Sequence, residues 1–146
     1  MRQENINIYK YDELSEEAKQ KAVEGLSDIN TDYDWWKYVY EDAKQVGIEI
    51  TEFDIDRRNI KGNIFLFPRQ VKKLILKNHG KECRTYKTVD GRDLRTKFGS
   101  AGFTYELLQD YLFMLTDSYE DAISKESIIE TVRCNDYEFT VDGELY

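Results

Sequence analysis

Four basic side chains on one predicted helix are the residues of this sequence best suited to bind a ligand. Arg69, Lys72, Lys73 and Lys77 include the spacings three, four and eight, which fall on one face of a helix. Such side chains pair with phosphate groups, and aromatic rings nearby in the sequence would stack on exposed bases. With two arginines that precede the helix, the candidate nucleic-acid-binding residues are Arg57, Arg58, Arg69, Lys72, Lys73 and Lys77. The alternative is a solvated helix face that balances acidic segments within the fold.

Three carboxylates alternate along a predicted strand. Glu52, Asp54 and Asp56 would share one face of a regular strand, and carboxylates so placed are able to bind Mg²⁺ as in metal-dependent nucleases. The apolar residues of the same strand change from even to odd positions, which indicates a bulge that turns at least one carboxylate away. We therefore favour a solvated strand face and assign no metal site.

His79 is the single histidine of the chain. It lies at the predicted C-terminal end of a helix, where a donor or cationic side chain interacts well with the last carbonyl groups. As a general base it would need a nucleophile within reach, and no sequence signature supplies one. We therefore assign no catalytic residue and no cofactor.

A second candidate surface combines tyrosines with acidic side chains. In the predicted helix that begins at Asp32 or Asp34, the apolar residues turned inward leave tyrosines on other faces. Exposed tyrosine among carboxylates favours protein binding, because tyrosine buries a large area at low entropic cost. The candidate partner-binding residues are Tyr33, Asp34, Tyr40 and Glu41. An ordinary acidic surface with half-buried rings is the alternative.

The charges of the chain fall into three blocks. Residues 1–56 carry a net charge of −9, residues 57–98 carry +10, and residues 99–146 carry −9, which sum to the formal net charge of −8. A basic band between acidic flanks is able to attract a polyanion or to be neutralised within the fold.

The composition favours one folded domain spanning residues 1–146. Twenty aromatic residues among 146 supply ample core material, and two cysteines are too few for a disulfide framework. The sequence has no apolar run of about 18 residues, so we expect no membrane partner and a cytoplasmic location.

The periodicity predicts an α+β fold of about five helices with a small antiparallel sheet. Three helices are expected at residues 16–27, with Ser15 as the N-cap, from 32 or 34 to 46, and at 68–80. Two more are expected to begin after the N-cap residues Thr104 and Ser124. Strands are expected at 5–9, 48–56, 60–67, 83–86, and in a C-terminal hairpin over 137–146 with a two-residue turn at Asp142-Gly143.

Several segments resemble a family of small acidic proteins scattered through bacteriophages and prophages, most of which have no assigned function. The resemblance lies in residues 8–22, 32–44, 47–57 and 127–146, and its most specific part is Asp32-Tyr-Asp-Trp-Trp36. It implies a phage setting and supplies no catalytic residues. Small acidic phage proteins are often inhibitors of a host enzyme, anti-CRISPR proteins among them.

Three functions follow as hypotheses. We expect a non-enzymatic phage-type protein that binds and inhibits a host defence factor, for example an RNA-guided nuclease. The first alternative is a module that binds RNA or single-stranded nucleic acid through residues 57–98, and the second is a metal-dependent nuclease. The oligomeric state and the identity of the partner stay open.

Overall fold

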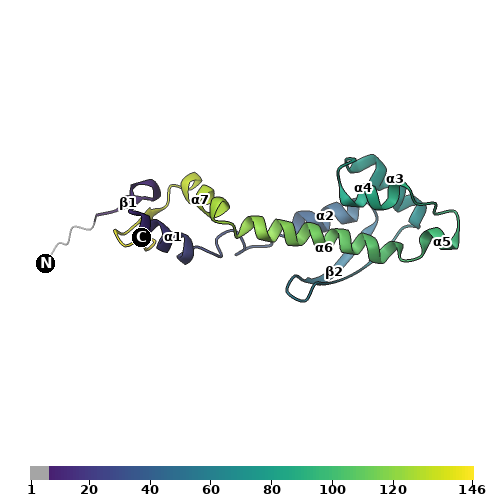
Figure 1. Cartoon of the computed structure of the whole chain (residues 1–146), viewed down its shortest axis with the longest axis horizontal. Helices are drawn as coiled ribbons and strands as arrows, with labels where there is room; N and C mark the ends of the chain where they lie inside the picture. The colour runs from purple at the N-terminus through teal and green to yellow at the C-terminus, as the bar shows by residue number, and fades with distance from the viewer. Residues whose placement is uncertain (1–6) are drawn as a thin grey trace. The chain divides into compact units, whose positions relative to one another are not determined.

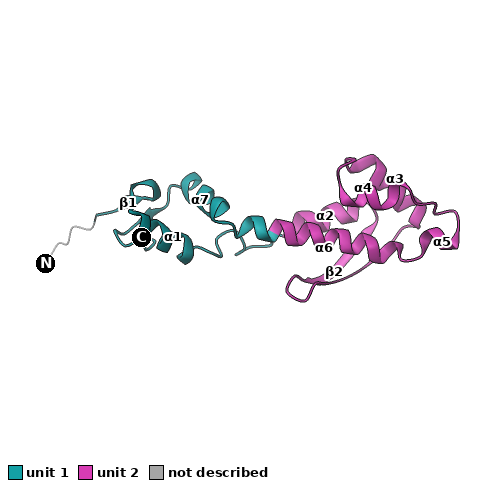
Figure 2. Ribbon diagram, in the orientation of Figure 1, with its two compact units in different colours: residues 1–35, 119–146 teal, residues 36–118 magenta. Residues whose placement is uncertain are grey.

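The computed structural model describes residues 7–146, which divide into two compact units. Unit 1 combines the two ends of the chain, residues 1–35 and 119–146, and unit 2 comprises residues 36–118 (Figure 2). The α+β class is confirmed, with helices and two small antiparallel sheets of two strands each. The expectation of one domain over residues 1–146 stays a prediction.

Unit 1 is built by pairing of the chain ends. Its elements are β1 (Tyr9–Lys10), the 3₁₀ turn η1 (Tyr11–Glu13), α1 (Glu16–Gly25), α7 (Lys125–Cys134) and β4 (Glu138–Phe139). Strand β1 pairs antiparallel with β4, and α1 contacts α7, so N-terminal and C-terminal segments lie together (Figure 1). Part of the predicted strand 5–9 lies outside the described residues. The buried side chains are Tyr11, Leu14, Ala18, Ala22, Ile128, Val132 and Phe139.

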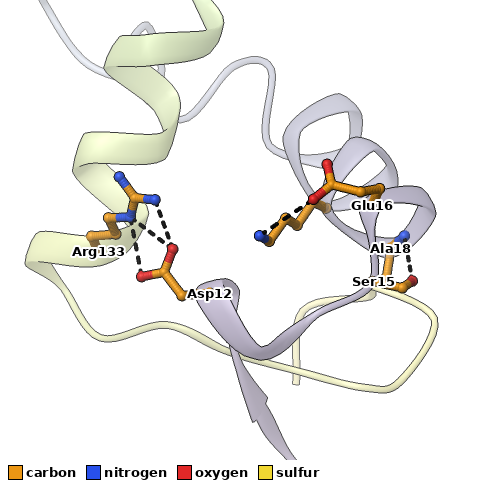
Figure 3. Close-up of polar contacts among 6 residues, drawn as sticks. Asp12, Ser15, Glu16, Ala18 and Arg133 are labelled. Carbon is orange, nitrogen blue, oxygen red and sulfur yellow. Dashed lines mark hydrogen bonds and ion pairs between the residues drawn. The ribbon is translucent and has the colours of Figure 1, made fainter.

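The helices of unit 1 begin at the residues that the sequence predicts. The hydroxyl of Ser15 accepts a hydrogen bond from the Ala18 amide at 3.2 Å, and Ser124 caps α7 in the same way. Arg133 of α7 donates to Asp12 of η1 at 2.6 Å (Figure 3). The bond holds the pKa of Asp12 below its usual range, so the pair adds an electrostatic link between the two ends of the chain.

The C-terminal hairpin forms with a different turn from the predicted one. The Thr140 amide donates to the Glu144 carbonyl at 2.8 Å and the Gly143 amide donates to Thr140, which makes a three-residue loop over 141–143. The predicted two-residue turn is therefore wrong. Gly143 has φ +87°, and a Cβ there would meet the Ala18 carbonyl oxygen at 2.1 Å, so the loop needs glycine both for its conformation and for its packing on α1.

Unit 2 contains most of the helices and the longer sheet. Its elements are α2 (Lys37–Gln45), β2 (Ile48–Asp54), β3 (Asn59–Ile64), α3 (Pro68–Asn78), α4 (Arg84–Asp90), α5 (Lys97–Ser100) and the first part of α6 (Phe103–Ala122). The β2–β3 register shifts between Ile50 and Glu52, which confirms the predicted bulge. The shift leaves Glu52 beside Lys61, with the carboxylate 2.9 Å from the ammonium group.

Two expected helix starts and one expected strand in unit 2 are wrong. The second helix begins at Lys37 rather than at 32 or 34, and α6 begins at Phe103, so Thr104 lies inside the first turn instead of capping it. Residues 83–86 begin helix α4 rather than a strand. Thr85 and Val89 are both fully buried, and their separation of four residues matches one face of a helix.

Candidate functional site

Helix α3 carries the predicted basic residues because its opposite face is buried. Pro68 occupies the first helical position, and the Phe67 amide donates to the side chain of Gln70 at 3.0 Å, which fixes the helix start. Val71 and Ile75 are completely buried. Arg69, Lys73 and Lys77 are consequently exposed, whereas Lys72 at the side of the helix is half-buried.

A cleft of about 540 Å³ lies between α3 and the segment that follows α4. Its lining residues are Arg69, Lys72, Lys73, Leu76, Asp90, Gly91, Arg92, Asp93, Leu94 and Arg95. Five of them are cationic and two are carboxylates, so the cleft has an excess of three positive charges at neutral pH. Figure 1 shows α3, α4 and the segment that leads into α5 at the same end of unit 2.

One hydrogen bond connects the two sides of this cleft. The Lys72 ammonium group donates to the Arg92 carbonyl at 2.6 Å, and helix α3 contacts α4 directly. Lys72 therefore joins the two walls, while its charge still faces the cleft that it lines.

Arg92 organises the segment beyond the cleft rather than offering a free charge. Its guanidinium group donates to the carbonyl oxygens of Gly99, at 2.6 Å, and Ala101, and it forms an ion pair with Glu106. It also lies 5.6 Å from the centre of the Phe103 ring. These bonds hold residues 93–102 against the start of α6.

The remaining charges of the cleft differ in their availability. Asp93 accepts hydrogen bonds from the Arg95 guanidinium group at 3.0 and 3.2 Å, and this contact lowers its pKa to about 2, so the pair is largely self-neutralised. Within residues 7–146, no carboxylate lies at ion-pair distance from Arg69, Lys73 or Lys77. Arg69 and Lys73 are thus the cleft cations most available to an external anion.

The structure gathers only part of the predicted basic set. Arg69, Lys72 and Lys73 line the cleft, whereas Lys77 lies farther along α3 and is not among its lining residues. Arg57 and Arg58 lie in the exposed turn between β2 and β3, where Arg57 approaches Asp54 at 3.7 Å. Arg92 and Arg95 belong to the predicted basic band 57–98, but the sequence did not place them beside α3, because only the packing of α3 on α4 brings the later segment there.

The predicted protein-binding residues are divided between the two units. Tyr33 is 64% exposed and Asp34 is exposed, and both belong to unit 1. Tyr40 and Glu41 belong to α2 of unit 2. The Tyr40 ring packs edge-on against Phe53 at 6.1 Å between ring centres, and its burial raises the pKa of its hydroxyl. Tyr40 therefore contributes to the packing of α2 on the sheet.

The sequence suggested that the His79 ring contacts the last carbonyl groups of the helix, and this prediction is wrong. The ring belongs instead to a buried polar cluster. Its Nδ1 lies 2.5 Å from the Thr85 hydroxyl, and its Nε2 lies 3.0 Å from Oδ2 of Asp42. The Nε2–H does not point along a hydrogen-bond direction, so this second contact is an electrostatic one. Tyr111 donates the aligned hydrogen bond to the same Asp42 oxygen at 3.0 Å.

This cluster links four helices rather than forming an active centre. Asp42, His79, Thr85 and Tyr111 come from α2, the end of α3, α4 and α6. The types Thr, His and Asp match those of a nucleophilic triad, but Thr85 is completely buried, so its hydroxyl is shielded from any substrate. Burial raises the pKa of Tyr111, while the approach of His79 lowers that of Asp42.

The carboxylates of β2 do not converge. Glu52 pairs with Lys61, and Asp54 approaches Arg57. In the part of the chain that the structure describes, no group of three or more His, Cys, Asp or Glu side chains is placed to hold a metal ion.

Comparisons with protein-family models, with curated proteins and with solved structures find no match. No helix within residues 7–146 has the length and apolar character needed to cross a membrane. The geometry of the cleft and the charges of the two units are therefore the observations from which a function is argued.

Proposed function

We propose that unit 2 binds nucleic acid through phosphate contacts in the basic cleft. The observation that carries this proposal is the joining of Arg69, Lys72 and Lys73 with the segment after α4 into one concave surface with excess positive charge. A concave site with convergent cations suits a phosphate chain better than a flat basic helix does, because several phosphates are contacted without large rearrangement.

The distribution of charge between the units supports the same proposal. Unit 1 holds 17 acidic and 6 basic residues, a net charge of −11, whereas unit 2 holds 12 acidic and 15 basic residues, a net charge of +3. Acidic side chains thus gather in the unit that lacks the cleft. A polyanion is attracted to unit 2 and repelled by unit 1, which favours one binding site over general adhesion.

Binding of a short single-stranded oligonucleotide to the full chain is expected to weaken with salt. Two to three phosphate contacts, matching the cations Arg69, Lys72 and Lys73, predict a slope of log K against log salt concentration of about −1.5 to −2. Fluorescence anisotropy with a labelled strand over a salt series measures this slope. Absence of binding at low salt, or binding that does not change with salt, would eliminate the proposal.

A second candidate function rests on a separate observation in unit 1. The pairing of β1 with β4 brings both acidic ends of the chain into one unit, where Tyr33 and Asp34 are exposed. We propose on this basis, and on the resemblance to phage proteins, that unit 1 binds and inhibits a basic host defence protein in the host cytoplasm. Carboxylates around an exposed tyrosine would complement a basic nucleic-acid channel.

Replacing Tyr33 and Asp34 by alanine is expected to abolish capture and inhibition of the host nuclease by the tagged full chain. Tyr146, which is 65% exposed in the same unit, provides the matched control, since Tyr146→Ala should leave capture unchanged. Quantitative affinity capture from infected host cells, followed by a cleavage assay on the captured nuclease, measures both effects. Equal capture by the double variant and the parent protein would reject this assignment of the surface.

A further inference from the structure

We propose that the ligand of the cleft is single-stranded nucleic acid, with bases stacked on the exposed rings of Phe67 and Phe98. This inference rests on the proposed function of unit 2 and adds the state of the strand. It draws on two features that phosphate contacts leave unexplained, namely two large apolar rings that are 78% and 93% exposed. Neither ring lines the cleft, but each belongs to a chain segment that adjoins a lining residue.

Phe67 is held at the start of the helix that forms one wall of the cleft. It occupies the N-cap position of α3, two residues before Arg69, and its amide is fixed by Gln70. Its backbone is therefore positioned, while its ring remains in solvent. A ring held beside a phosphate-binding cation is suitably placed for a base attached to the same strand.

The backbone beside Phe98 is fixed by the packing of its neighbour Gly99. Gly99 packs so closely on the Asp93 backbone that a Cβ at residue 99 would lie 1.4 Å from the Asp93 carbonyl oxygen. Arg92 also donates to the Gly99 carbonyl at 2.6 Å. Asp93 lines the cleft, so these contacts hold the backbone of the short helix α5 against a lining residue, and Phe98 directly precedes Gly99 in that helix.

The combination of rings and cations favours a single strand over a duplex. Base faces in a duplex are already stacked, so a duplex would satisfy the cations but leave both phenylalanines in water. A single strand exposes base faces and phosphates together. The cleft volume of about 540 Å³ lies in the range typical of small-ligand sites, which suits local contact with a few nucleotides.

Three probes of equal length separate the contributions of bases and phosphates: an oligothymidine strand, an abasic strand with the same phosphates, and a duplex. The full-length protein is expected to bind the thymidine strand at least about tenfold more tightly than either of the others. Phe67→Ala and Phe98→Ala should each weaken thymidine binding by roughly tenfold and leave abasic binding unchanged. Tyr146→Ala, which removes a 65% exposed ring from unit 1, serves as the control and should change neither.

The outcomes distinguish the stacking inference from the proposed function of unit 2, which is phosphate binding in the cleft. Equal binding of the thymidine and abasic strands would overturn the stacking inference and leave phosphate binding by the cleft intact. Thymidine binding unaffected by both phenylalanine variants would also overturn it. Failure to bind any of the three probes would overturn the proposed function itself.

Discussion

Replacing Arg69 and Lys73 together by glutamate is expected to weaken binding of a single-stranded oligonucleotide on the order of 100-fold at low salt. Both side chains line the cleft and have no carboxylate within ion-pair distance in residues 7–146. Their reversal therefore replaces two attractive phosphate contacts by two repulsive ones without breaking an internal bond. The slope of log K against log salt concentration should become shallower by about 1.4 in parallel, because each lost contact with a single strand removes about 0.7.

A matched variant separates the cleft from the total charge of unit 2. Lys77→Glu with Lys81→Glu changes the net charge by the same amount, and neither lysine lines the cleft. This control is expected to weaken binding only several-fold, through long-range repulsion. Lys72 is left in place because its bond to the Arg92 carbonyl supports the cleft wall. Equal losses in the two double variants would show that the cleft is not the site.

Replacing Asp42 by alanine is expected to lower the free energy of unfolding by about 1–3 kcal/mol. Its carboxylate accepts the hydrogen bond of the completely buried Tyr111 hydroxyl and faces the His79 Nε2, so alanine leaves two polar groups without their partner. Urea unfolding followed by circular dichroism measures the loss. Tyr111→Phe is the control and should cost about 1 kcal/mol or less, because Asp42 keeps His79. A smaller loss for Asp42→Ala than for Tyr111→Phe would contradict this account.

The same carboxylate makes stability depend on pH. His79 is the main cause that holds the pKa of Asp42 below its usual range, while partial burial acts in the opposite direction. A carboxyl with a lowered pKa stabilises the fold above its unfolded pKa of about 3.9, and the contribution disappears as pH falls through the folded pKa. Burial raises the pKa of Asp110, so the contribution of Asp110 to stability changes with pH in the opposite direction. This contribution cancels when the parent protein is compared with a variant at Asp42, because both proteins carry Asp110.

Comparison of the parent protein with Asp42→Asn isolates this contribution. The difference in the free energy of unfolding should be present at about pH 5 and shrink as the pH falls below the unfolded pKa of about 3.9, because the Asp42 carboxyl then takes up a proton. Urea midpoints at pH values above and below this pKa measure it. A difference that stays constant across this range would show that the charge of Asp42 does not stabilise the fold.

Features determined by neighbouring residues were predictable from the sequence. The caps at Ser15 and Ser124, the proline at the start of α3 and the bulge after Ile50 depend on local hydrogen bonds, a fixed φ angle and the alternation of apolar residues. Helix α4 was missed because it is short and buries only Thr85 and Val89. Two buried positions do not distinguish a helix from a strand until the packing surface is known.

Of the candidate site, only the wall formed by α3 was predictable from the sequence. The spacing of Arg69, Lys72 and Lys73 places them on one side of α3, and this follows from helical geometry alone. The second wall follows from the packing of α3 on α4, across which Lys72 donates to a backbone carbonyl twenty residues later. Backbone carbonyls carry no sequence signature, so no pattern could have identified Arg92 as its partner. The role of His79 was misjudged for a similar reason, because Asp42 lies 37 residues before it.

The sequence by itself determined the sign and order of the three charge blocks, because charge belongs to each residue independently of the fold. Only the tertiary structure decided how the blocks combine. Pairing of β1 with β4 joins the acidic ends of the chain into a unit of net charge −11, and the basic band is left in a unit of net charge +3. The physical reason is that strand pairing and core packing act between residues more than a hundred positions apart, where local spacing carries no information.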